Sequence, residues 1–183
     1  SREGTGYQTT PAFIQAADSA SSLLSDSLGK YPGHLPEALI CGATCADLGP
    51  IMRGEKEAVQ VLFTSGGADL LDQFYGDGLV TSPWLAAIGS AVAEAARQLP
   101  EGRGLRILEI GAGTGGLASQ VLPLIERGVH SYVFSDVSAA FFPAARQKLA
   151  AYPEVEFHTF DLEKPGNEQE FDLGSFDIIL GTN

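Results

Sequence analysis

Apolar residues along the first 80 positions recur at the spacing of α-helices. Between Pro11 and Leu28 they fall three or four residues apart, which predicts a helix, at Phe13, Ile14, Ala17, Ala20, Leu23, Leu24 and Leu28. Glycines and prolines between 29 and 36 end that helix, and shorter helices are expected over about 36–50, 54–63 and 69–75. No alternation of apolar and polar residues is visible here, so this half predicts a helical subdomain.

From residue 82 onward, short apolar runs alternate with helical segments. A helix is expected from Ser82, as its N-cap, to Leu99, with Pro83 at the first helical position. The next segments predict strands at 105–110, 131–135, 155–160 and 176–181, and helices at 115–127 and 139–151. This alternation is typical of a parallel α/β sheet with crossover helices.

Composition narrows the class of protein. The chain has 183 residues, of which 44% are apolar and 19% charged, which is enough to bury a core. The 23 acidic and 11 basic residues give a net charge of −12, which disfavours nucleic acids and anionic membranes as partners. Without a long apolar run or a signal peptide, we expect a cytoplasmic protein. The chain has no initiator methionine and stops after an apolar run, so we expect it to be part of a longer protein.

The most informative segment is the glycine-rich sequence after the first core strand. Gly111, Gly113 and Gly116 fit the dinucleotide pattern G-x-G-x-x-G, whereas Glu109, Gly111, Gly113 and Gly115 fit E-x-G-x-G-x-G, the loop of S-adenosylmethionine-dependent methyltransferases. Both patterns use glycines for a tight turn and for close approach of a ligand to the main chain. The glycines alone therefore leave both cofactors open.

Charge favours the second pattern. A dinucleotide places two phosphates at this turn, yet the charged residue beside it is Glu109, and no Lys or Arg lies between Arg106 and Arg127. S-adenosylmethionine carries a sulfonium and an ammonium, and a carboxylate about 6 Å from a cation gains on the order of 1–3 kcal/mol at intermediate dielectric.

Two further acidic residues follow the next strands. Asp136 ends the second strand, where a carboxylate can accept both ribose hydroxyls of either cofactor. Asp161 and Leu162 follow the third strand and are candidates for binding adenine. By contrast, Asp177 is interpreted as structural.

No catalytic or metal-binding residue is predicted. Each of the three histidines, His34, His130 and His158, is interpreted as structural or surface-exposed. Cys41 and Cys45 lack neighbouring ligands for a metal, so they are interpreted as ordinary thiols.

Several segments together resemble the methyltransferase domain embedded in polyketide synthases: 108–123 (LEIGAGTGGLASQVLP), 132–145 (YVFSDVSAAFFPAA), 157–166 (FHTFDLEKPG), 176–183 (FDIILGTN) and, upstream, 72–84 (DQFYGDGLVTSPW). The resemblance implies a helical lid subdomain at 1–80 and, at 81–183, the first four strands of a class I, Rossmann-like parallel sheet.

The resemblance also implies roles for individual residues. The methionine end of S-adenosylmethionine would be held by Glu109, Gly111, Ala112, Gly113 and Gly115. Asp136 and Val137 would hold ribose and adenine, Asp161 and Leu162 would flank the adenine, and Asn183 would lie near the methyl donor. In the family the catalytic histidine and acidic residues follow the fourth strand, so this resemblance assigns no catalytic residue here.

The function implied by the resemblance is methylation of the α-carbon of a β-ketoacyl thioester. The substrate would be carried on the phosphopantetheine arm of an acyl carrier protein, with neighbouring synthase domains as further partners. Three alternatives stay open: an O-methyltransferase of the same family, a non-catalytic structural pseudo-methyltransferase, and an NAD-dependent oxidoreductase.

Overall fold

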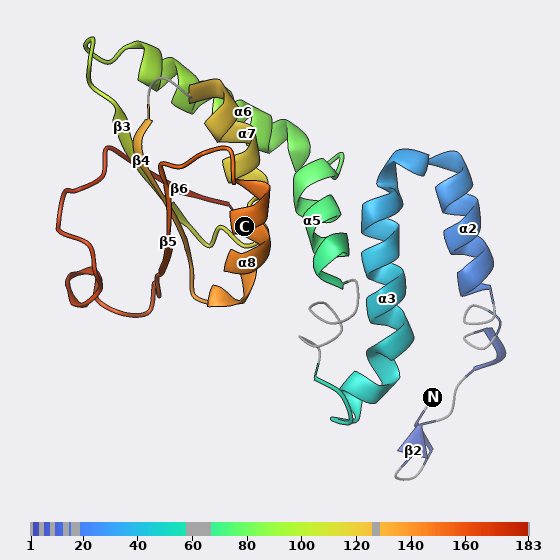
Figure 1. The fold of residues 1–183 in the computed structure, drawn as a ribbon. Coiled ribbons are helices and arrows are strands. Elements are labelled where there is room, and N and C mark those ends of the chain that lie inside the picture. Colours follow the sequence, from blue (N-terminus) through green and yellow to red (C-terminus); the bar gives the residue numbers. More distant parts are fainter. Residues whose placement is uncertain are drawn as a thin grey trace.

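Four parallel strands form the sheet of the C-terminal half of the molecule. The computed structural model describes residues 2–3, 6–7, 10–12, 15, 19–57, 67–125 and 129–182. The sheet contains β3 (Leu105–Ile110), β4 (Val129–Asp136), β5 (Val155–Thr159) and β6 (Ile178–Gly181) in the order β5-β4-β3-β6, all parallel (Figure 1). This confirms the predicted parallel sheet, and each strand lies within two residues of its expected bounds.

Three helices cover one face of this sheet: α6 (Ser82–Arg97), α7 (Gly116–Ile125) and α8 (Phe142–Lys148), the last preceded by a 3-10 turn, η2 (Ala139–Phe141) (Figure 1). Strand register places Ile107 beside Tyr132, and Glu109 beside Phe134, on the face toward these helices. The hydrophobic core lies between them and includes the fully buried side chains of Ile107, Val121, Leu122, Tyr132 and Phe134.

The segment between β5 and β6 packs an aromatic cluster beside the sheet. The ring of Phe171 lies 5.4 Å from that of His158, 5.8 Å from that of Phe160 and 5.3 Å from that of Phe176. This segment also contains the 3-10 turn η3 (Gly166–Glu168). His158 therefore belongs to this cluster, which agrees with its interpretation as a structural or surface residue.

Asp177 ties the start of β6 to the start of β3. Its carboxylate accepts hydrogen bonds from the Arg106 main-chain N–H at 2.9 Å and from the Arg103 guanidinium at 2.7 Å. These donors, the Arg106 N–H first, lower the pKa of Asp177. The structural interpretation of Asp177 is thus confirmed.

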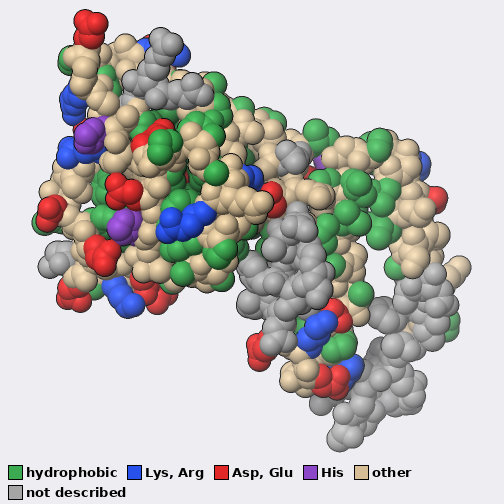
Figure 2. All heavy atoms as spheres, viewed as in Figure 1, with side chains coloured by type: hydrophobic (Ala, Val, Ile, Leu, Met, Phe, Trp, Pro, Cys, Tyr) green, Lys and Arg blue, Asp and Glu red, His purple; other side chains and the backbone are tan. Residues whose placement is uncertain are grey.

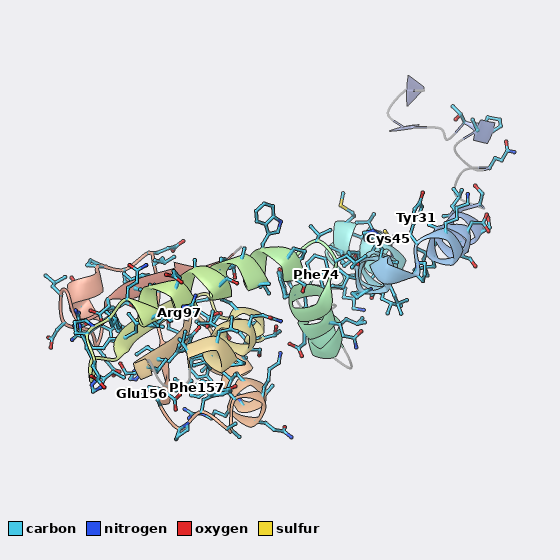
Figure 3. All side chains as sticks on the ribbon, turned by 90° about the horizontal axis from the view of Figure 1, so that it is seen from above. Tyr31, Cys45, Phe74, Arg97, Glu156 and Phe157 are labelled. Carbon is cyan, nitrogen blue, oxygen red and sulfur yellow. The ribbon has the colours of Figure 1, made fainter. Side chains whose placement is uncertain are left out.

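The helical half extends away from the sheet. It contains α2 (Ala20–Lys30), the 3-10 turn η1 (Pro32–His34), α3 (Leu35–Met52) and α5 (Gly67–Asp77). We call α2, η1 and α3 the helical arm. Seen from above, the arm with Tyr31 and Cys45 lies on the far side of Phe74 in α5 from Arg97 and Phe157 in the core (Figure 3). The helix α5 therefore connects the arm to the core.

Two details of the N-terminal half differ from the sequence-based expectation. The helix predicted at 54–63 is wrong at its start, because 53–56 form a turn and bend in which Gly54 has φ +72°, and residues 58–66 lie outside the described part. Part of the helix predicted at 11–28 also lies outside it. A short hairpin pairs β1 (Arg2–Glu3) with β2 (Gly6–Tyr7), and strands of two residues are too short to leave an alternating pattern.

The start of α6 also differs from the prediction. Thr81, not Ser82, is its N-cap residue, and the Thr81 hydroxyl donates to the Phe74 carbonyl at 2.8 Å. This bond ties the end of α5 to the beginning of α6.

None of the helices that the structure describes combines the length and apolar character needed to cross a bilayer. Cys41 and Cys45 are free, exposed thiols on α3, and no group of three or more metal-ligating side chains is found among the described residues.

Candidate functional site

The glycine turn joins β3 to α7 at the carboxyl edge of the sheet. Gly111, Gly113 and Gly115 have φ of +66°, +52° and +80°, a region that other residues adopt only at a cost in energy. A side chain at Gly111 would meet no atom within 4 Å, so the main chain there is open to an approaching molecule. The positive φ explains why glycine is favoured at the turn, and the open space at Gly111 leaves the main chain accessible to a ligand.

Three N–H groups of this turn already donate within the protein. Ala112 N–H donates to the Ser135 carbonyl at 2.9 Å, and Gly115 N–H donates to the Ala112 carbonyl at 2.8 Å. Gly113 N–H donates to Asp136 Oδ2 at 3.0 Å. These three donors are not available to a phosphate, which weakens the case for a dinucleotide at this turn.

A cavity of about 610 Å³ opens beside the turn. One wall comes from the turn and the ends of the strands, and the other from α5, the α5–α6 junction and η2. Its lining is Leu71, Tyr75, Val80, Thr81, Trp84, Leu85, Gly111, Ala112, Gly113, Thr114, Gly116, Asp136, Phe141 and Thr182. Asp136 is the single charged residue of this lining, so the electrostatics of the described wall favour a cationic ligand over an anionic one.

Asp136 is held in place by main-chain donors. Its Oδ2 accepts from Gly113 N–H, and its Oδ1 accepts from Ser138 N–H at 2.9 Å. The residue is only 6% exposed. Because a carboxylate has about four acceptor positions, two are left for hydroxyl groups of a ligand. The next residue, Val137, is 69% exposed. The geometry is thus compatible with the predicted ribose contact.

Thr114 supplies a second polar group to the lining. Its Oγ1 is buried and has no hydrogen-bond partner among the described residues. A buried hydroxyl without a partner costs free energy. A polar ligand group in the cavity would remove that cost.

Glu109 lies beneath the turn and does not line the cavity. It is 1% exposed, and the Tyr132 hydroxyl donates to its Oε2 at 2.7 Å. Burial raises its pKa to about 7, opposed by the Tyr132 hydrogen bond and reinforced by the Asp136 charge. Burial likewise raises the pKa of Tyr132 well above its ordinary value. Strand alternation explains this placement, because it directs Glu109 toward the helices that cover the sheet. Contact of Glu109 with a cofactor stays a prediction.

Asp161 and Leu162 lie on a loop beside Asp136. The loop follows β5, and its Phe160 N–H donates to the Asp136 carbonyl at 3.0 Å. The Glu163 N–H bond is the first cause of the lowered pKa of Asp161, and Lys164 adds to it. Leu162 is 72% exposed.

Gln169 fixes the same loop. Its side-chain amide accepts from Asp161 N–H at 2.8 Å and donates to the Asp161 carbonyl at 3.0 Å. Neither Asp161 nor Leu162 lines the cavity, and their contact with adenine stays a prediction. Asn183 lies outside the described residues, although its neighbour Thr182 does line the cavity.

Sequence reasoning missed the second wall of the cavity. Residues of that wall come from α5 and the start of α6, such as Tyr75 and Trp84, and lie far along the chain from the turn. The resemblance of segment 72–84 to the methyltransferase domains of polyketide synthases was the one signal that could have located them.

A basic residue also lies close to the turn, although none is near it in sequence. Lys148, at the end of α8, donates to the Thr114 carbonyl at 3.3 Å and forms an ion pair with Asp72 of α5. It does not line the cavity.

Comparison with known proteins agrees with this geometry. The family model described as a methyltransferase domain matches residues 108–183. The non-reducing polyketide synthase Preu3 of Preussia isomera is 34% identical over 184 residues, covering 99% of this chain and 7% of the synthase.

Two solved structures similar to this chain are also methyltransferases. The CurJ carbon methyltransferase is 31% identical with a TM-score of 0.84, covering 89% of this chain and 43% of that one. The trans-methyltransferase CalH, solved in complex with SAH, is 28% identical with a TM-score of 0.74, covering 97% of this chain and 50% of that one. The chain thus spans half or less of these two methyltransferases and a small part of the synthase.

Proposed function

The chain belongs to the family of methyltransferase domains found in polyketide synthases, and from this premise we propose that it binds S-adenosylmethionine at the glycine turn. We further propose that it serves to methylate the α-carbon of a β-ketoacyl thioester carried by an acyl carrier protein. The observation that carries the proposal is the cavity between the turn and α5, whose described lining has Asp136 as its one charged residue.

The described residues fit this cofactor. The open main chain at Gly111 would receive the methionine end, together with the unpartnered hydroxyl of Thr114. Asp136 would accept from the ribose, while Val137, Asp161 and Leu162 would lie against the adenine. When bound, S-adenosylmethionine supplies an electrophilic methyl group on a positively charged sulfur. The chain's part is to orient that group and to exclude water from it.

The comparisons favour carbon as the methylated atom. The CurJ structure is that of a carbon methyltransferase, and its TM-score and identity are high enough to support more than a shared fold. Polyketide synthases are the relatives over nearly the whole chain, which supports neighbouring synthase domains and a carrier protein as partners. In this proposal residues 1–80 act as the lid and residues 81–183 as the cofactor-binding core.

Calorimetric titration tests the proposal. The full chain should bind S-adenosylmethionine and its demethylated product S-adenosylhomocysteine (SAH) and leave NAD unbound. Gly113→Val should abolish binding, because a branched side chain at positive φ distorts the turn. Binding of NAD in preference to SAH would contradict the proposal and support the oxidoreductase alternative.

A second assay locates the methyl group. Because the family's catalytic residues follow the fourth strand, the assay uses a longer form of the protein that continues past Asn183. This form is incubated with S-adenosylmethionine and a β-ketoacyl thioester, and the product is analysed by mass spectrometry and NMR. We expect methylation at the α-carbon. Methylation at oxygen would instead support the O-methyltransferase alternative, and cofactor binding without transfer would support the non-catalytic one.

A further inference from the structure

Lys148 is the point at which three separate elements of the molecule meet. It ends α8, its Nζ forms an ion pair with Asp72 of α5, and the same Nζ donates to the Thr114 carbonyl at 3.3 Å. Its Cδ lies 3.9 Å from the position that a side chain at Gly115 would occupy. A single side chain therefore contacts both the glycine turn and the helix on the opposite side of the cavity.

The contact between α5 and the turn is close. A side chain at Gly116, the first residue of α7, would lie 3.2 Å from the Tyr75 carbonyl oxygen and 3.6 Å from the Gly76 nitrogen. Leu71 and Tyr75, on the same helix as Asp72, line the cavity. Any movement of α5 away from α7 would therefore displace one wall of the cavity.

Lys148 also affects the lining of the cavity, through its contact with Thr114. Lys148 holds the main-chain carbonyl of Thr114, and the side-chain hydroxyl of the same residue is buried in the lining without a partner. The orientation of the Thr114 peptide sets where that hydroxyl lies. Lys148 is thus placed to fix both the polar group offered to a ligand and the helix that faces it.

We propose that Lys148 is a positioning residue that couples the placement of α5 to the conformation of the glycine turn, and thereby raises the affinity of the cavity for the cofactor. This inference rests on the proposed function. Lys148 does not line the cavity itself. It acts through its contacts with Asp72 and Thr114.

The exposure of the pair gives the inference a distinct signature. The side chains of Lys148 and Asp72 are 31% and 42% exposed, so their attraction is screened by salt and adds little to overall stability. A purely structural role would change the melting temperature and leave the salt dependence of binding unaltered. A positioning role predicts that added salt weakens SAH binding by the wild type more than by a variant without the pair.

The experiment titrates SAH into the full chain and follows the fluorescence of Trp84, the single tryptophan, which lines the cavity. The variants are Lys148→Met, Asp72→Asn, the double variant and Lys148→Arg. Lys56→Met is the matched control, because Lys56 forms a comparable ion pair with Asp47 of α3 in the helical arm, with side chains 37% and 31% exposed.

Lys148→Met should raise the Kd for SAH about tenfold, since it removes an ion pair and a hydrogen bond. Asp72→Asn should raise it about threefold, because the Thr114 bond remains. The double variant should be no weaker than Lys148→Met, Lys148→Arg should bind within about twofold of the wild type, and Lys56→Met should be unchanged.

Two results would overturn the inference while leaving the proposed function intact: a wild-type Kd for Lys148→Met, or effects of the two single variants that simply add. If Lys148→Met does not fold, the Kd of Asp72→Asn for SAH and the salt dependence of SAH binding test the inference in its place. Failure of the wild type to bind SAH at all would overturn the proposed function and this inference with it.

Discussion

The sheet half and the helical arm are built from similar apolar residues but bury them to very different extents. In the sheet half, Ile107, Leu122 and Phe134 have no exposed surface. In the arm, neither α2 nor α3 contains a buried residue, and Leu48 and Met52 are 53% and 78% exposed. Figure 2 shows hydrophobic side chains gathered over α2 and α3 on one face of the molecule. Local periodicity therefore forms helices in both halves, but only the sheet supplies a second layer to pack against.

The two halves also use charge differently. Glu109 is buried in the core beside Tyr132, whereas Glu55 pairs with Arg53 on the surface near the arm. Glycines at positive φ occur in both: Gly113 faces the cavity, and Gly54 lies in open space after α3. The two glutamates, Glu109 and Glu55, and the two glycines, Gly113 and Gly54, therefore allow matched tests of the difference between the two halves.

The largest expected effect comes from removing a buried leucine. Leu122→Ala in α7 should lower the free energy of unfolding by about 2–5 kcal/mol, because it deletes fully buried methyl groups and leaves a cavity. Leu48→Ala in α3 should change it by less than about 0.5 kcal/mol. Urea denaturation followed by circular dichroism measures both. Equal losses would show that the arm has a packed core of its own and would remove the contrast.

The second test concerns the buried carboxylate. The pKa of Glu109 is raised to about 7 from an ordinary value of 4.5, so the folded chain holds this proton more tightly than the unfolded chain. Its contribution to stability is fully present below about pH 4.5 and is lost as the pH rises through 7. Glu109→Gln removes that loss and should make the variant more stable than the wild type at pH 8 by up to about 3 kcal/mol.

Thermal or urea unfolding of both proteins between pH 4 and pH 8 measures this difference. The gap should open between pH 4.5 and pH 7 and be flat above it. Glu55→Gln is the control, because Glu55 is exposed and its pKa is lowered by Arg53, so no such gap should open over that window. A gap for Glu109→Gln that is independent of pH would contradict a raised pKa.

The third and smallest effect on stability separates strain from binding. Gly113→Ala and Gly54→Ala each place a side chain at positive φ, and each should cost about 1–2 kcal/mol of stability. Only Gly113→Ala should weaken SAH binding, by about tenfold or more, because only Gly113 belongs to the turn. Calorimetric Kd values of the two variants provide the measurement, and an equal loss of affinity in both would contradict the assignment of the site to the turn.

The sequence predicted the sheet and the glycine turn because both depend on local signals. Buried parallel strands read as short apolar runs, and positive φ selects glycine at Gly111, Gly113 and Gly115. Burial in the arm was not predictable, since the same periodicity in α2 leads to no buried residue. The second wall of the cavity and Lys148 were also missed, because α5 and the end of α8 meet the turn only after the chain has folded, 34 residues apart in the case of Lys148 and Thr114.

The prediction for Glu109 shows the same limit of reasoning from sequence alone. The motif placed a carboxylate next to the turn in sequence, but strand alternation turns it away from the cavity and toward Tyr132. Asp136, from the neighbouring strand, is the acidic group that reaches both the cavity and the turn.

A crystal structure of the chain grown with SAH tests the central claim most directly. The account predicts the amino-acid portion against residues 111–115 and both ribose hydroxyls on the Asp136 carboxylate, with α5 closing the opposite wall. A ligand bound elsewhere, or a ribose that leaves Asp136 without a contact, would contradict it.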